Sequence, residues 1–137
     1  MDIKIKGDVS MSATQAIFNT IPKEDKFHFF NGSNPNYDKI KEVLDFSKND
    51  ISKASHVPAE SVRYDEKMPQ ELRERMTEWA IGLALVASHF NDLDKTILWF
   101  RVPNPLLGGI SPKDMIKVGR FNKLLKFIQT ALDENKR

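Results

Sequence analysis

The sequence predicts an all-α fold: a helix-turn-helix-like bundle, a C-terminal helical domain and an irregular or partly β N-terminal arm. Apolar residues recur at helical spacing along most of the chain after residue 36. Prolines and capping residues mark several helix starts. The alternation that is typical of strands occurs only weakly, near the N-terminus. We therefore expect an arm over residues 1–36, a helix-turn-helix-like region over 37–67 and a helical domain over 68–137.

In the arm, Ile3 and Ile5 alternate with charged residues, which is a weak strand signal. Ser12 is suited to cap a short helix through Asn19. Alternation returns at 27–29, so a pairing of this segment with residues 2–6 is expected. The run 31–36, rich in Asn, Gly, Ser and Pro, predicts a loop and a boundary.

Three short helices are expected over 37–67. The first spans about three turns from Tyr37. Ser47 is suited to the N-cap of the second, and Pro58 to the first turn of the third. Their buried faces are predicted from apolar spacing: Ile40, Val43, Leu44, Ile51, Ala54 and Val62.

The longest helix is predicted from Pro69 to about Phe90, and it is apolar on so much of its circumference that it belongs at the centre of the core. Asn91 or Asp92 is expected to start the next helix, which has Leu93, Ile97 and Phe100 on one face and stops before Pro103.

Two more helices are expected towards the C-terminus. One starts at the cap Ser111 and ends at Gly119. The last one has an apolar face from Phe121 to Leu132, and the tail 133–137 is expected to fray.

Composition narrows the class of protein. The 137 residues are 40% hydrophobic and 29% charged, which is typical of a folded, soluble domain. The chain has no cysteine, which excludes disulfides, thiolate zinc sites and cysteine nucleophiles. Because no apolar run approaches the ~18 residues that span a bilayer and no signal stretch opens the chain, we expect a cytoplasmic protein without membrane contact.

Charge is distributed unevenly. Residues 37–67 carry six basic and seven acidic side chains, whereas residues 101–137 carry eight basic and three acidic ones, a net charge of +5. The C-terminal segment is therefore suited to phosphates or to an acidic protein surface.

No catalytic constellation is recognisable. The histidines His28, His56 and His89 lie far apart, and none has a ligand partner three or four residues away. Motifs for a phosphate loop or an activated serine are also missing. We therefore expect no enzyme, no catalytic residue, no metal site and no cofactor.

The segment from Ile51 to Tyr64 resembles a helix-turn-helix, with His56 at the turn position that usually holds glycine. The second helix would enter the major groove of DNA. Acidic residues on its flanks repel phosphate, so a helix-turn-helix that never touches DNA is an equal alternative. The DNA-binding candidates are Lys53, Pro58, Ser61 and Arg63.

Prolines and a glycine pair crowd the segment 98–114. Prolines stiffen the backbone, and glycines allow tight turns or close approach to another surface. This pattern favours either a recognition loop or an elaborate connection between helices.

The order Trp99, Pro103-Asn104, Leu107-Gly108-Gly109, Ser111-Pro112 and Asp114-Met115-Ile116 resembles the signature of the Xre/MbcA/ParS antitoxin family, in its C-terminal toxin-binding domain. The resemblance covers about residues 37–132. It implies an antitoxin of a bacterial type II pair, whose usual partner is a RES-domain toxin that depletes NAD. Such an antitoxin occludes the toxin's active site and often represses its own operon.

Carried onto this chain, the resemblance implies nine toxin-binding residues: Arg101, Pro103, Asn104, Leu107, Gly108, Gly109, Ser111, Pro112 and Asp114. The expected partners are the cognate toxin and operator DNA, in a homodimer or a toxin–antitoxin hetero-oligomer. The alternative is a helix-turn-helix transcriptional regulator without a toxin partner.

Overall fold

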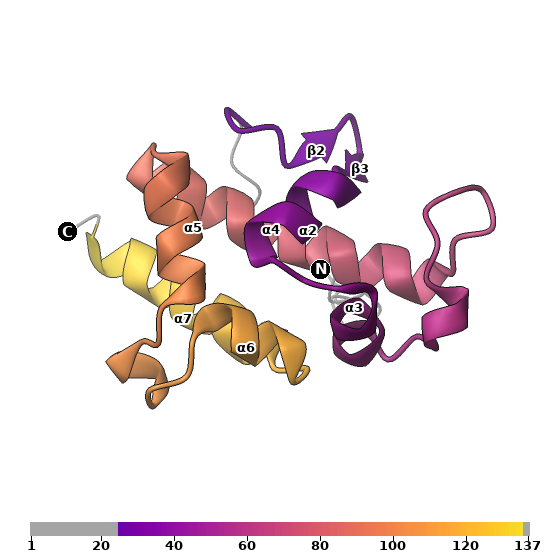
Figure 1. Ribbon diagram of the computed structural model, residues 1–137. Coiled ribbons are helices and arrows are strands. Elements are labelled where there is room, and N and C mark those ends of the chain that lie inside the picture. The colour runs from indigo at the N-terminus through magenta and orange to yellow at the C-terminus, as the bar shows by residue number, and fades with distance from the viewer. Residues whose placement is uncertain (1–24, 136–137) are drawn as a thin grey trace, which may run out of the picture.

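The computed structural model of the chain describes residues 25–135 (Figure 1). The predicted strand over residues 2–6 and the predicted helix from Ser12 to Asn19 lie outside the described residues. Within 25–135, six α-helices and one two-stranded hairpin confirm the all-α class with a partly β arm. No helix in this part of the chain has the length and apolar character needed to cross a membrane.

The elements follow one another in a simple order. Strands β2 and β3 are followed by helices α2 to α7, with short 3-10 turns η1 and η2 after α3 and α5. Their bounds are β2 Phe30–Asn31, β3 Asn34–Pro35, α2 Tyr37–Leu44, α3 Lys48–Ser55, η1 Ala59–Ser61, α4 Gln70–Phe90, α5 Leu93–Arg101, η2 Pro105–Leu107, α6 Pro112–Lys117 and α7 Phe121–Asn135.

Helix α4 runs through the middle of the molecule, as its apolar circumference predicts (Figure 1). Trp79 is 1% exposed and meets the ring of Phe46 edge-on, with 5.8 Å between ring centroids. Gly82 faces α7, where an added Cβ would lie 3.0 Å from the ring of Phe121. One hydrophobic cluster thus extends from Phe29 to Ile128.

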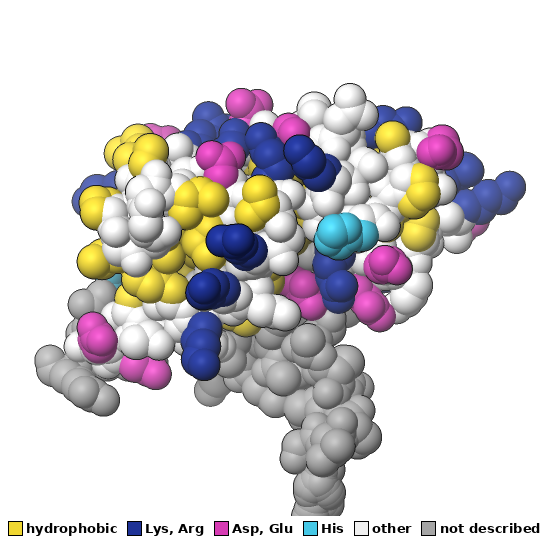
Figure 2. Space-filling view, turned by 90° about the horizontal axis from the view of Figure 1, so that it is seen from below, with side chains coloured by type: hydrophobic (Ala, Val, Ile, Leu, Met, Phe, Trp, Pro, Cys, Tyr) yellow, Lys and Arg dark blue, Asp and Glu magenta, His cyan; other side chains and the backbone are white. Residues whose placement is uncertain are grey.

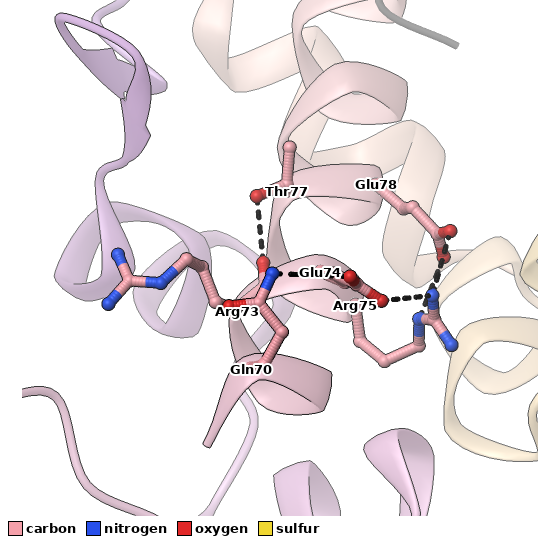
Figure 3. Close-up of polar contacts among 6 residues, drawn as sticks. All are labelled: Gln70, Arg73, Glu74, Arg75, Thr77 and Glu78. Carbon is pink, nitrogen blue, oxygen red and sulfur yellow. Dashed lines mark hydrogen bonds and ion pairs between the residues drawn. The ribbon is translucent and has the colours of Figure 1, made fainter. Parts of the chain in front are cut away.

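Polar side chains of α4 point to opposite sides of the helix (Figure 3). On one side, the Arg73 guanidinium donates to the Asn34 Oδ1 atom at 3.3 Å and to the Tyr37 hydroxyl at 3.4 Å. On the other side, Arg75 pairs with Glu78, with 3.1 Å between Nε and Oε1. Glu78 is only 4% exposed, so this ion pair compensates a buried carboxylate.

The hairpin corrects two expectations about the arm. Residues 31–36, predicted as a loop, include β3 and the end of β2, with Phe30 paired to Pro35 and Asn31 to Asn34. The predicted strand at 27–29 is wrong, because His28 has a φ of 59°, in the left-handed region. The Asp25 carboxylate accepts hydrogen bonds from the backbone N–H groups of Phe29 and Phe30, which fixes the turn before β2.

Helix α3 begins and turns as predicted. Ser47 accepts from the backbone N–H of Asp50 at 3.1 Å while the Asp50 carboxylate accepts from the N–H of Ser47, which is a complete capping box. His56 ends the helix with a φ of 62°. The helix expected after Pro58 is wrong, since only the three-residue turn η1 forms there.

The C-terminal helices match their predicted starts. Asp92 caps α5, Ser111 caps α6, and Gly119 follows α6 with a φ of 83°. The expected fraying of 133–137 is wrong for its first part, because α7 continues to Asn135.

Candidate partner-binding site

Asn104 organises the loop between α5 and α6. Its side-chain Oδ1 accepts from the backbone N–H of Leu106 at 2.9 Å. Its own N–H donates to the Ile110 carbonyl at 3.1 Å, and its carbonyl accepts from Gly109 at 3.0 Å. With Pro103 and Pro105 also fixing φ, the loop is held in one conformation before any partner arrives.

The glycine pair serves the backbone turn. Gly108 and Gly109 have φ values of 84° and 87°, which L side chains rarely adopt. An added Cβ at either position would meet nothing within 4 Å. Both residues are therefore needed for their conformation rather than for a close approach within this chain.

Several predicted toxin-binding residues build the start of α6. Ser111 is 3% exposed and accepts from the backbone N–H of Asp114 at 3.2 Å. Pro112, also buried, occupies the first turn. Asp114 lies 3.9 Å from the ammonium of Lys117. Ser111 and Pro112 therefore orient α6 and offer little surface to a partner, whereas about half of the Asp114 side chain is exposed.

Arg101 holds α5 against α2. Its guanidinium donates to the backbone carbonyl of Val43 at 3.1 Å and to that of Glu42 at 2.9 Å. Carbonyls at a helix C-terminus lack partners within the helix, and a cation there also suits the helix dipole. The Arg101 guanidinium is thus engaged in hydrogen bonds within the chain.

Three large apolar side chains of this region are exposed. Leu106 is 79% exposed, Leu98 62% and Val102 44%, and we call these three the apolar loop surface. Beside them lies a groove of about 430 Å³ between α5 and the loop, with Trp99, Pro103 and Pro105 in its walls. Exposed apolar residues around a groove are typical of protein interaction sites.

Sequence reasoning did not single out the apolar loop surface. The signal was present, because Leu98 falls off the stripe formed by Leu93, Ile97 and Phe100. Leu107, a predicted toxin-binding residue, is half-buried against the core. Trp99 was expected to be structural; it packs edge-on against Phe100 at 5.0 Å but also lines the groove.

The predicted DNA-binding residues do not share a helix. Lys53 is exposed on α3. Pro58 directly precedes η1, Ser61 is the last residue of η1, and Arg63 lies two residues after it. The Arg63 guanidinium binds the Asp65 carboxylate through two hydrogen bonds of 2.7 and 2.5 Å. These bonds lower the pKa of Asp65 and raise that of Arg63. No recognition helix forms in this segment.

Within residues 25–135, no three His, Cys, Asp or Glu side chains come together in a group that could hold a metal ion. Comparison of the sequence with protein-family models and with curated proteins found no match. We therefore take the loop between α5 and α6 as the candidate functional site.

Proposed function

We propose that this chain is the antitoxin of a bacterial type II toxin–antitoxin pair and that it binds its toxin through the apolar loop surface. The expected toxin resembles a RES-domain enzyme that depletes NAD. The observation that carries the proposal is the exposure of Leu106, 79%, at the tip of a loop fixed by Asn104.

Physical chemistry favours such a loop as an inhibitor. Burial of apolar surface contributes roughly 25 cal/mol per Å², and a loop that is already ordered loses little conformational entropy on binding. Inhibition needs no chemistry from this chain, because a loop seated over the toxin's active site excludes its substrate.

The residues of the signature then divide into two roles. Asn104, Gly108, Gly109 and Ser111 shape the loop and the start of α6. The residues between them, such as Leu106, contact the toxin. The signature residues thus form the scaffold of the loop, and the exposed positions between them set which toxin is bound.

Operator binding through residues 53–63 is not part of the proposal. A three-residue 3-10 turn cannot fill a major groove as a recognition helix does, and Arg63 is held by Asp65. The transcriptional regulator without a toxin has no observation in its favour.

The proposal is tested by co-expression of the tagged chain with the product of the adjacent reading frame. We expect the two proteins to purify together and Leu106→Asp to abolish this. Ser33→Asp, in the turn of the β2–β3 hairpin, is the matched control because that hairpin lies across α2 from the loop (Figure 1). Lack of co-purification, or retention by Leu106→Asp at the wild-type level, would reject the proposal.

A further inference from the structure

The six basic residues within 101–135 fall into two groups. Arg101 is occupied by the carbonyls of α2. Lys117 lies 3.6 Å from the Asp50 carboxylate, and Lys113 lies 6.0 Å from the ring centroid of Phe46. These cations serve contacts within the chain.

The second group is Arg120, Lys123 and Lys126, which we call the α7 basic strip. All three are exposed, and within residues 25–135 none of them takes part in a hydrogen bond or an ion pair through its side chain. Spacings of three residues place them on one side of α7. Within residues 101–135, the cations that have no hydrogen bond or ion pair in the described part of the chain and are exposed therefore lie at this strip.

Folding of α7 does not account for the strip. Each of the other five helices within residues 25–135 has an acidic residue in its first turn, where the helix dipole favours negative charge: Asp38, Asp50, Glu71, Asp94 and Asp114. Helix α7 has none there. Its first turn carries Lys123, and Arg120 directly precedes it, so both cations occupy places that are locally unfavourable.

The strip adjoins apolar surface. Figure 2 shows Lys and Arg side chains over the middle of the face formed by α6 and α7, next to hydrophobic side chains gathered towards η2. The exposed Leu106 belongs to η2, and Val118, 55% exposed, lies two residues before Arg120. An apolar centre with a charged rim is the anatomy of a protein–protein interface.

We propose that the α7 basic strip is the rim of the toxin-binding surface and that the toxin presents carboxylates around an apolar recess that receives Leu106. This inference rests on the proposed function. Nucleic acid fits the same face less well, because a phosphate backbone gains nothing from exposed Leu106 and Val118 and protein–DNA interfaces are much more positively charged. Complementary rim charges act mainly on the association rate.

The test measures association and dissociation rates of the chain with the product of the adjacent reading frame at low and high salt. The variant Arg120→Glu, Lys123→Glu, Lys126→Glu is compared with Lys39→Glu, Lys48→Glu, Lys67→Glu, which changes the net charge equally at positions before the C-terminal segment. We expect the strip variant to associate at least about 10-fold more slowly at low salt, with little change in dissociation rate, and the difference to shrink as salt rises.

Each other outcome is decisive. Equal association rates for the two variants would overturn the inference and leave the proposed function standing, whereas the absence of any complex would overturn both. Binding of the chain to a labelled random DNA duplex, with a salt slope of about −0.9 per phosphate contact that the strip variant loses, would reassign the strip to nucleic acid. Thermal unfolding of the strip variant should stay at or above the wild-type value, because acids replace cations in the first turn of α7.

Discussion

The segments 47–64 and 98–116 both carry sequence motifs, but the structure agrees with the predicted elements more closely in the second segment than in the first. In 98–116 the side chain of Asn104 accepts a hydrogen bond from the loop backbone, and that of Ser111 caps α6. In 47–64 the N-cap at Ser47 and the turn at His56 form as predicted, but the helix expected after Pro58 does not. The helix starts predicted at the capping residues Ser47 and Ser111 thus form, whereas the start predicted at Pro58 gives only a three-residue turn.

The failed helix after Pro58 has a local cause. The Asp65 side chain accepts from the backbone N–H of Lys67 at 3.0 Å, and the Asp65 carbonyl accepts from Met68 at 2.9 Å. Such side-chain bonds compete with helix formation. Pro69 also disfavours the helical conformation at Met68, so only a short window was left for a helix.

The largest predicted effect concerns the core beneath the loop. Phe100 is fully buried, so Phe100→Ala should destabilise the chain by about 3–5 kcal/mol in urea unfolding. Trp99→Ala should cost clearly less, because its ring is only half-buried, while weakening the toxin complex through the groove. If Trp99→Ala destabilised as much as Phe100→Ala and left binding intact, Trp99 would be purely structural.

Arg101 joins the segment 98–116 to the C-terminal end of α2, and its substitution should have the second-largest effect on stability. Arg101→Ala removes two charge-assisted hydrogen bonds to the C-terminal carbonyls of α2, an expected cost of about 1.5–3 kcal/mol in urea unfolding. Arg101→Lys should recover only part of this, because an ammonium lacks the planar fork of donors. Unchanged stability together with lost toxin binding would instead make Arg101 a contact residue.

The glycine pair gives a smaller effect on stability. Gly108→Val or Gly109→Val should cost about 1–3 kcal/mol from the positive φ alone, since a Cβ meets no neighbour. Neutralisation of the toxin in a growth assay should fall further than this loss explains, because the loop changes shape. Gly108→Asn is the control, since asparagine tolerates this region better, and it should retain more neutralisation. A well-folded valine variant that still neutralises the toxin would remove the loop from the interface.

The smallest effect is expected in the segment 47–64. Arg63→Ala should leave affinity for promoter DNA unchanged, because the Asp65 carboxylate already holds the guanidinium. Electrophoretic mobility shift with the chain's own promoter and with random DNA measures this. Weaker and less selective binding by Arg63→Ala would show that the ion pair opens on DNA and would restore the helix-turn-helix interpretation.

Local signals in the sequence determined most of the helices. Capping and turn residues act over a few positions, so Ser47, Asp92 and Ser111 could be read without knowledge of the rest of the fold. The apolar circumference of α4 likewise fixed its central place. The overall class and most element starts followed from these features.

Only the tertiary structure decided which side chains remain available to a partner. Arg101 and Arg63 are equally charged in the sequence, but one is occupied by distant carbonyls of α2 and the other by a carboxylate two residues away. Leu106 is an apolar residue that could belong to the core, and only the packing of the neighbouring helices leaves it 79% exposed. The pairing of Arg101 and the exposure of Leu106 depend on contacts between segments far apart in the chain, which no local pattern encodes.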